Sequence, residues 1–264
     1  MGHPASEQRA AFQTQLQGLA PHMHRYDVFR DFIIMAACSL HNAVQKDDGR
    51  EAEYMEIIGR YGPEDRQTFP KLMALLVAML DPEPRDILGP LYMELEVASR
   101  DQGQFFTPPE VSNLMAEMTW SDQQISDRPF VTLQEPACGA GGMVLAFVKS
   151  MIDRGHDPSR KLWTQCIDVD RLAALMAYVQ LSLWHVPGEI LVGNTLSWEH
   201  RERWLTPAHM LGNWSAKLAA RENDQVTTRA TEPVTAGGDA VLLEAPAPSV
   251  APDQMTFDFG GGAK

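Results

Sequence analysis

The chain has 264 residues, 44% of them hydrophobic, which is long enough for one sizeable domain with an appendage. No apolar run approaches the roughly 18 residues of a membrane span, and the start lacks the layout of a secretory signal, so we expect a cytoplasmic protein without a membrane partner. The net charge of −13 disfavours a protein that holds nucleic-acid phosphates by its overall field; a DNA role would need a local basic face or a partner.

Residues 1–100 are predicted to form a helical region. Apolar residues recur at spacings of three and four in DVFRDFIIMAACSLHNAV and in FPKLMALLVAMLDPEPRDILGPLYMELEVASR. The segment between them, KDDGREAEYMEIIGRYGPEDRQ, is strongly charged and is interrupted by Gly62 and Pro63. We therefore expect a solvated connection between two groups of helices.

Residues 101–220 follow a different pattern. Short apolar runs such as FVTLQ, LWTQCI and EILVG alternate with helical patterns, which is typical of a parallel α/β sheet. Ligands bind such sheets at the carboxyl ends of the strands, where the segments EPACGAGG, IDVD and GNT fall. The sequence thus predicts an α/β fold with a helical N-terminal region and a binding site at this edge. Residues 221–264 are rich in Thr, Ala, Gly and Pro and are predicted to be a disordered tail.

The segment EPACGAGG, residues 135–142, places three glycines between a strand and a helix. Without Cβ atoms, the backbone N–H groups can approach a ligand at the positive end of the helix, which suits a nucleotide-like molecule. The segment has neither the Lys-Ser/Thr end of a P-loop nor a G-x-G-x-x-G spacing, so a nucleotide-binding dehydrogenase is a poorer match. A tight turn without a ligand is the alternative.

Two polar residues end the next predicted strands. Asp168 is placed to accept both ribose hydroxyl hydrogens of a nucleoside, or to cap a helix. Asp170 is better placed as the cap because it directly precedes the helical run RLAALMAYVQL. Asn194 offers the donor and the acceptor that an adenine edge requires, or it forms a turn.

The segment QFFTPPEV lies upstream of the glycine turn. Thr107 is expected to cap a helix, with Pro108 at the first helical position and Glu110 three residues after Thr107. Helix capping explains these residues but leaves Phe105 and Phe106 without a role. The three cysteines lack the paired spacing of a zinc site and are odd in number, so we predict reduced thiols and no metal site.

The ordered set GQFFTPPEV, EPACGAGG, IDVD and GNTL, over roughly residues 100–198, resembles the cofactor-binding half of the adenine-N6 DNA methyltransferases, especially the modification subunits of type I restriction systems. The resemblance implies a Rossmann-like sheet, S-adenosyl-L-methionine (AdoMet) as cofactor, and adenine N6 in DNA as the methyl acceptor. Only about three strands are readable in this sequence, fewer than in the full methyltransferase fold, so we expect the sheet to be truncated. The resemblance also implies contacts with the methionine part of AdoMet from Phe106, Thr107 and Pro108, and from Glu135, Ala137, Gly139 and Gly141 of the glycine loop. It assigns the ribose to Asp168 and the adenine to Asn194.

The catalytic motif of that family, Asn/Asp-Pro-Pro-aromatic, is not found in the sequence. The Pro108-Pro109 pair belongs to the upstream segment. Asn213-Trp214 offers an amide and a stacking ring but lacks the prolines, and it lies in EHRERWLTPAHMLGNWSAKLAAR, which predicts one helix or two. Trp204 and His209 in this segment are predicted to be packing residues.

Two functional hypotheses therefore stand. The chain is an AdoMet-binding methyltransferase of this family, with DNA specificity supplied by a partner, or a non-catalytic AdoMet-binding or antirestriction-like module that acts through a protein partner. In addition, QMTFDF, from Gln254 to Phe259, resembles the bacterial sliding-clamp-binding peptide, with chance recurrence as the alternative.

Overall fold

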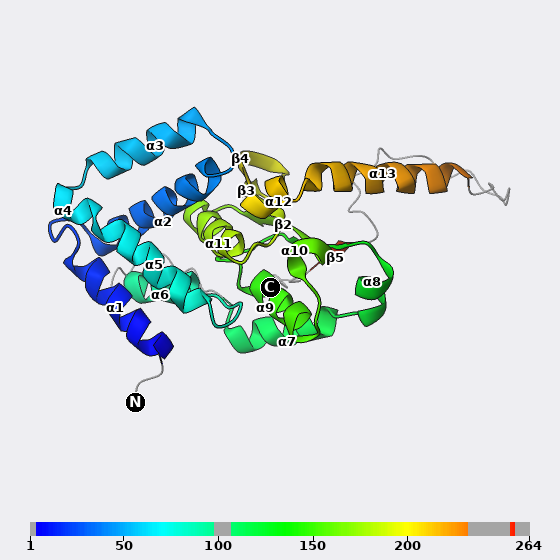
Figure 1. Cartoon of the computed structure of the whole chain (residues 1–264), viewed down its shortest axis with the longest axis horizontal. Coiled ribbons are helices and arrows are strands. Elements are labelled where there is room, and N and C mark those ends of the chain that lie inside the picture. The colour runs from blue at the N-terminus through cyan, green and yellow to red at the C-terminus, as the bar shows by residue number, and fades with distance from the viewer. Residues whose placement is uncertain (1–3, 98–106, 232–253, 257–264) are drawn as a thin grey trace, which may run out of the picture.

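The computed structural model describes residues 4–97, 107–231 and 254–256 (Figure 1). The N-terminal region is helical, and its elements are α1 (Pro4–Gly18), α2 (Arg25–Asn42), α3 (Asp48–Gly59), α4 (Pro63–Arg66), α5 (Thr68–Leu80) and α6 (Leu88–Val97). The second region contains α7 (Pro109–Thr119), α8 (Asp122–Asp127), β1 (Val131–Glu135), α9 (Gly142–Asp153), α10 (Pro158–Lys161), β2 (Leu162–Asp168), α11 (Arg171–Leu183), β3 (Gly188–Asn194), β4 (Glu199–Leu205), α12 (Pro207–Leu211), α13 (Trp214–Thr231) and β5 (Gln254–Thr256).

The strands form one sheet in the order β4-β3-β2-β1-β5. Strands β1, β2 and β3 run parallel and are connected by the helices α9 and α11, as the alternating sequence pattern predicts. Their carboxyl ends lie at one edge, since Glu135 pairs with Cys166 and Asp168 pairs with Val192. The predicted α/β fold with a helical N-terminal region is confirmed.

Strand β4 occupies the first part of the segment that was predicted as one helix or two, so the prediction is wrong there, whereas α12 and α13 confirm it for the rest of the segment. Strand β4 runs antiparallel to β3 at the edge of the sheet. One face buries Trp204, whereas the neighbouring Arg203 is exposed and donates from Nε to Glu189 Oε2 of β3 at 2.6 Å. Because an edge strand needs few apolar side chains, its run of charged residues carried no alternating hydrophobic signal.

The charged segment between the two apolar helical stretches was predicted as a solvated connection, but it contains α3 and α4. Asp47 caps α3, because its Oδ1 accepts hydrogen bonds from Gly49 N at 2.9 Å and Arg50 N at 3.1 Å. Within α3 only Ile57 is buried. A helix with so little buried surface has almost no hydrophobic period by which a sequence could reveal it.

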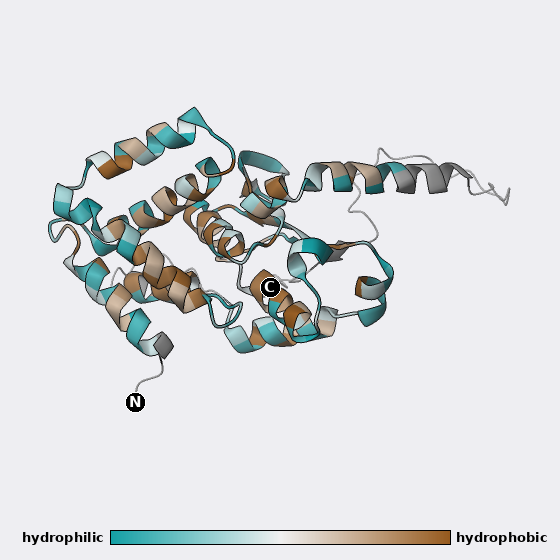
Figure 2. Cartoon of the chain, in the orientation of Figure 1, coloured by the Kyte–Doolittle hydropathy of each residue, from teal (hydrophilic) through white to brown (hydrophobic). Residues whose placement is uncertain are grey.

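One hydrophobic core runs through both regions, from Phe12 of α1 through Phe147 of α9 to Trp204 of β4. The hydrophobic residues of α5 and α9 contribute to this core, whereas α3 is largely hydrophilic (Figure 2). Because the two regions share this core, the helical region is packed directly against the sheet region. The predicted domain boundary at residue 100 lies outside the described residues.

A partly buried set of ion pairs also joins the two regions. Arg171, the first residue of α11, donates to both carboxylate oxygens of Glu53 on α3 at 2.9 Å. Its Nε donates to Glu202 of β4 at 2.6 Å. A bidentate contact of this kind fixes direction as well as distance, so α3, α11 and β4 are held in one geometry.

The C-terminal part differs from its predicted limits. Helix α13 continues to Thr231, past residue 220, where we placed the start of the tail. Strand β5 pairs with β1 through Gln254 and Thr132, so the first residues of the QMTFDF peptide belong to the sheet. The rest of the predicted tail, and Phe257 to Phe259 of that peptide, lie outside the described residues. In the part of the chain that the structure describes, no helix has the length and apolar character needed to cross a membrane.

Candidate functional site

The glycine loop joins β1 to α9 at the carboxyl edge of the sheet. Gly141 caps α9 with a φ of 88°, a left-handed conformation that favours glycine, and a Cβ there would lie 3.2 Å from Ala177 Cβ of α11. The loop is tied to the neighbouring strand, because Cys138 N donates to Ile167 O at 2.9 Å. The glycines therefore allow the loop to approach α11 closely and leave Ala137 exposed.

Asp168 fixes this loop from the end of β2. Its Oδ2 accepts a hydrogen bond from Gly139 N at 2.8 Å, and its Oδ1 accepts one from Asp170 N at 2.9 Å. Burial raises the pKa of the carboxyl group above its usual range. The expected cap is confirmed at Asp170, which accepts from Leu172 N at 2.8 Å. Each carboxylate oxygen of Asp168 holds one backbone donor and keeps a further lone pair for a ligand.

Glu135, the last residue of β1, lies beneath the loop and is fully buried. Its Oε1 accepts from Ala137 N at 3.3 Å, whereas Oε2 has no hydrogen-bond partner among the described residues. Burial, with a smaller contribution from the nearby Asp168, raises the pKa of Glu135 to about 7, while the hydrogen bond from Ala137 acts in the opposite direction. A buried carboxylate oxygen without a donor is the kind of group that a cation or hydrogen-bond donor of a ligand satisfies.

The raised pKa of Glu135 predicts a pH dependence of stability. The native state holds a proton that the unfolded chain loses above an ordinary pKa of 4.5, so the free energy of unfolding falls as the pH rises from about 4.5 to about 7. Glu135→Gln removes this titration. We expect urea denaturation between pH 4.5 and 7.5 to show a smaller decline for the variant than for the wild type. Parallel curves for the two proteins would contradict the assignment.

Asn194 ends β3 and is exposed. Its Oδ1 accepts from Leu196 N at 2.9 Å, so the residue forms the turn that was its alternative role. The adjacent Thr195 hydroxyl donates to Pro136 O, which joins this turn to the glycine loop. Asn194 therefore lies at the same edge of the sheet as Asp168 and Gly139.

Two apolar residues at this edge were missed from the sequence. Val169 and Leu196 are 63% and 94% exposed, and each lies in the connection that follows a parallel strand. Large exposed aliphatic side chains beside a polar binding edge provide surfaces for a flat, apolar group such as an adenine ring. The signal was present in the sequence, since Val169 directly follows Asp168 and Leu196 lies two residues after Asn194.

Thr107 and Pro108 lie on a second wall, at the start of α7. The helix begins at Pro109 with Pro108 as its N-cap, and no side chain caps it. The expected cap at Thr107, with Pro108 in the first helical position, is therefore wrong. Pro109, the first residue of α7, already has the φ angle of a helix because of its ring, so a side-chain cap is not needed. Phe106, like Phe105, lies outside the described residues.

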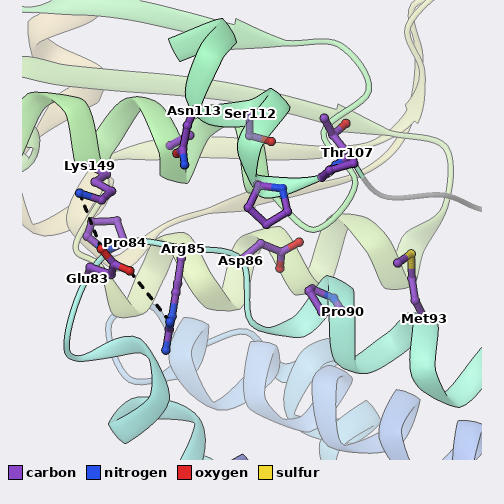
Figure 3. A pocket seen from close by; sticks show the side chains of 14 residues that line it. Glu83, Pro84, Arg85, Asp86, Pro90, Met93, Thr107, Ser112, Asn113 and Lys149 are labelled. Carbon is purple, nitrogen blue, oxygen red and sulfur yellow. Dashed lines mark ion pairs between the residues drawn. The ribbon is translucent and has the colours of Figure 1, made fainter. Parts of the chain in front are cut away.

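A pocket of about 450 Å³ opens between α6, α7 and α9, and Figure 3 shows it from close by. Thr107, Pro108 and Gly142 line it together with Asp86 and Ser112. The pocket thus adjoins the glycine loop at the first residue of α9, and it brings the helical N-terminal region into the candidate site.

Comparison with protein families matches residues 84–227, more than half of the chain, to the family described as N-6 DNA Methylase. The chain belongs to the N-6 DNA methylase family. This assignment confirms the resemblance seen in the ordered motifs, and the match includes α6, the last helix of the N-terminal region.

Two solved structures are also similar to this N-6 DNA methylase chain. One is a protein described as a modification subunit of a type I restriction enzyme from Vibrio vulnificus YJ016, with 19% identity and a TM-score of 0.39, over 60% of this chain and 35% of that one. The other is a protein described as a class I S-adenosylmethionine-dependent methyltransferase from Listeria monocytogenes, with 13% identity and a TM-score of 0.33, over 63% of this chain and 52% of that one. The chain spans about a third of the first protein and about half of the second. Comparison with curated proteins finds no match.

Asn213 and Trp214 do not reach the candidate site of this N-6 DNA methylase chain. Trp214 is fully buried, and its ring lies 5.0 Å from that of Phe130, which directly precedes β1 at the other end of the strand. A ring packed in this way has no free face on which a base could stack. His209 and Trp204 are buried, and His209 Nδ1 accepts from Trp163 Nε1 at 2.9 Å, which confirms both as packing residues.

Proposed function

We propose that this chain binds AdoMet at the carboxyl edge of β1, β2 and β3, and that it serves the transfer of a methyl group to adenine N6 in DNA. The observation that carries the proposal is the hydrogen bond from Gly139 N to Asp168 Oδ2, which brings the glycine loop and the acidic end of β2 into one site. Asp168 would then hold the ribose hydroxyls, as the family resemblance implies.

The residues present fit such a cofactor. Glu135 Oε2 is buried without a donor among the described residues, and Val169 and Leu196 offer exposed apolar surface. When bound, AdoMet supplies a methyl group on a positively charged sulfonium, an activated electrophile. The protein's contribution to methyl transfer is therefore chiefly alignment rather than acid–base chemistry.

Recognition of DNA would need more than the candidate site. Four basic side chains line a second pocket of about 480 Å³, namely Arg128, Arg160, Lys217 and Arg221. This pocket adjoins the start of β1 and α10, at the amino ends of the strands, whereas the candidate site lies at their carboxyl ends. A duplex held at this basic pocket would not lie over the cofactor, so a specificity partner remains part of the proposal.

A second candidate is a non-catalytic AdoMet-binding or antirestriction-like module that acts through a protein partner. The observation in its favour is that the sequence lacks an Asn/Asp-Pro-Pro-aromatic motif, and that the burial of Trp214 removes the substitute we considered. The contact between the QMTFDF peptide and a sliding clamp stays a prediction, since neither the fold nor the comparisons test it.

Transfer of tritiated methyl groups from AdoMet to unmethylated DNA distinguishes the two candidates. The assay is run on the purified chain alone and again with only the specificity subunit of a type I restriction system added. Incorporation at adenine N6 in either mixture supports the methyltransferase. AdoMet binding without incorporation in both mixtures supports the non-catalytic module and contradicts the catalytic proposal.

A further inference from the structure

Ser112 carries a buried hydroxyl that nothing in the described structure uses. The residue lies on α7, is 3% exposed and lines the pocket between α6, α7 and α9 (Figure 3). Its Oγ has no hydrogen-bond partner among the described residues. Because a buried hydroxyl without a partner is unfavourable, this group is suited to a ligand that enters the pocket.

Asp86, in the segment before α6, faces the same place. Its Oδ1 is occupied, because it accepts from Gly89 N at 2.8 Å and from Gln180 Nε2 at 2.9 Å. The other oxygen, Oδ2, lies near the first residue of α9: a Cβ on Gly142 would lie 3.6 Å from Asp86 Oδ2 and 3.8 Å from Ser112 Oγ. The carboxylate and the hydroxyl therefore lie on the wall of one pocket, beside the end of the glycine loop.

The charge of Asp86 is not balanced within the described residues. The two cations that line the pocket, Lys149 and Arg85, pair instead with Glu83 at 3.6 Å and 3.9 Å, as the dashed lines of Figure 3 show. No described ion pair includes Asp86, and burial raises the pKa of its carboxyl group. A cation placed beside Oδ2 would offset this cost of burial.

A carboxylate and a hydroxyl on the wall of one pocket can both accept hydrogen bonds from the same primary ammonium group. We propose that Asp86 and Ser112 bind the α-ammonium group of the methionine part of AdoMet, so that the helical N-terminal region selects the amino-acid end of the cofactor. The inference rests on the proposed function, and it adds two residues that lie outside the glycine loop and the strand ends. Thr107 and Pro108, to which the family resemblance assigns contacts with the methionine part, line the same pocket.

Three ligands distinguish a contact with the charged aminoalkyl chain from contacts with the adenosine part. AdoMet carries the ammonium and the carboxylate, decarboxylated AdoMet keeps the ammonium alone, and 5′-methylthioadenosine lacks both of them and the sulfonium charge as well. S-adenosylhomocysteine keeps the ammonium without the sulfonium charge, and it shows which of the two charges a variant affects. We would titrate each into the full chain by calorimetry, using the wild type, Asp86→Asn and Ser112→Ala. Asp127→Asn, at the exposed end of α8, is the matched control.

We expect Asp86→Asn to weaken AdoMet and decarboxylated AdoMet by at least about tenfold, and Ser112→Ala to weaken both by about threefold to tenfold, with methylthioadenosine unchanged. Equal weakening of all three ligands, or no change for any, would overturn the inference. Since Ser112 Oγ makes no described hydrogen bond, Ser112→Ala keeps the fold and still tests the ammonium contact where Asp86→Asn does not fold. A folded wild type that binds none of the three ligands overturns the proposed function itself, and with it this inference.

Discussion

Asp168→Ala is expected to weaken AdoMet binding by at least about tenfold. The substitution removes the predicted acceptor of two ribose hydrogen bonds, and it also removes the acceptor that holds Gly139 N at 2.8 Å. The glycine loop and the ribose contact are therefore lost together. Calorimetric titration with AdoMet measures the effect, and thermal unfolding without ligand reports the fold.

Two further variants distinguish the loss of the hydrogen bond to the glycine loop from the loss of the ribose contact. Asp168→Asn keeps one oxygen that can accept from Gly139 N, so it should retain the loop but lose the charge, and we expect an intermediate affinity. Asp170→Ala removes the cap of α11 and should lower stability by about 1 kcal/mol with little change in affinity. An Asp168→Ala variant that is folded and binds AdoMet as tightly as the wild type would contradict the ribose assignment.

Gln180→Leu is expected to lower the free energy of unfolding by about 3 kcal/mol or more. Gln180 on α11 is fully buried and uses its whole amide group. Its Oε1 accepts from Ile87 N at 2.7 Å and Leu88 N at 3.2 Å, and its Nε2 donates to Asp86 and, at 2.8 Å, to Ala140 O. Leucine has a similar size, but it would leave several buried polar groups without partners, each at about 1–3 kcal/mol.

Urea denaturation measures this decrease in the free energy of unfolding. Gln123→Leu, on the exposed surface of α8, is the control for adding an apolar side chain, and it should stay within about 0.5 kcal/mol of the wild type. Since Ala140 belongs to the glycine loop, Gln180→Leu should also weaken AdoMet binding. A Gln180→Leu protein as stable as the control would show that this network does not hold the helical region to the loop.

The carboxyl edge of the sheet could be predicted because its signals are local. The turn after β1 needs glycine at position 141, where φ is 88°, and Asp170 directly precedes the helix that it caps. Features of this kind lie within a few residues of the element that they control. The order of the motifs along the sequence then indicated the resemblance to the family.

The remaining parts of the candidate site depend on contacts between distant residues. Asp86 and Gln180 are 94 positions apart, and only the packing of α6 against α11 brings them together. Ser112 is one hydroxyl on an otherwise ordinary helix, and its lack of a partner among the described residues is a property of the folded chain. Strand β4 was missed for the opposite reason, because its charged residues at a sheet edge are equally suited to a helix surface.

Direct calorimetric titration of the purified full chain with AdoMet tests whether the glycine loop and Asp168 form an AdoMet site. We expect saturable binding of one AdoMet per chain for the wild type, and binding at least about tenfold weaker for Asp168→Ala. A folded wild-type protein that gives no binding heat, and no rise in melting temperature with excess AdoMet, would contradict this expectation.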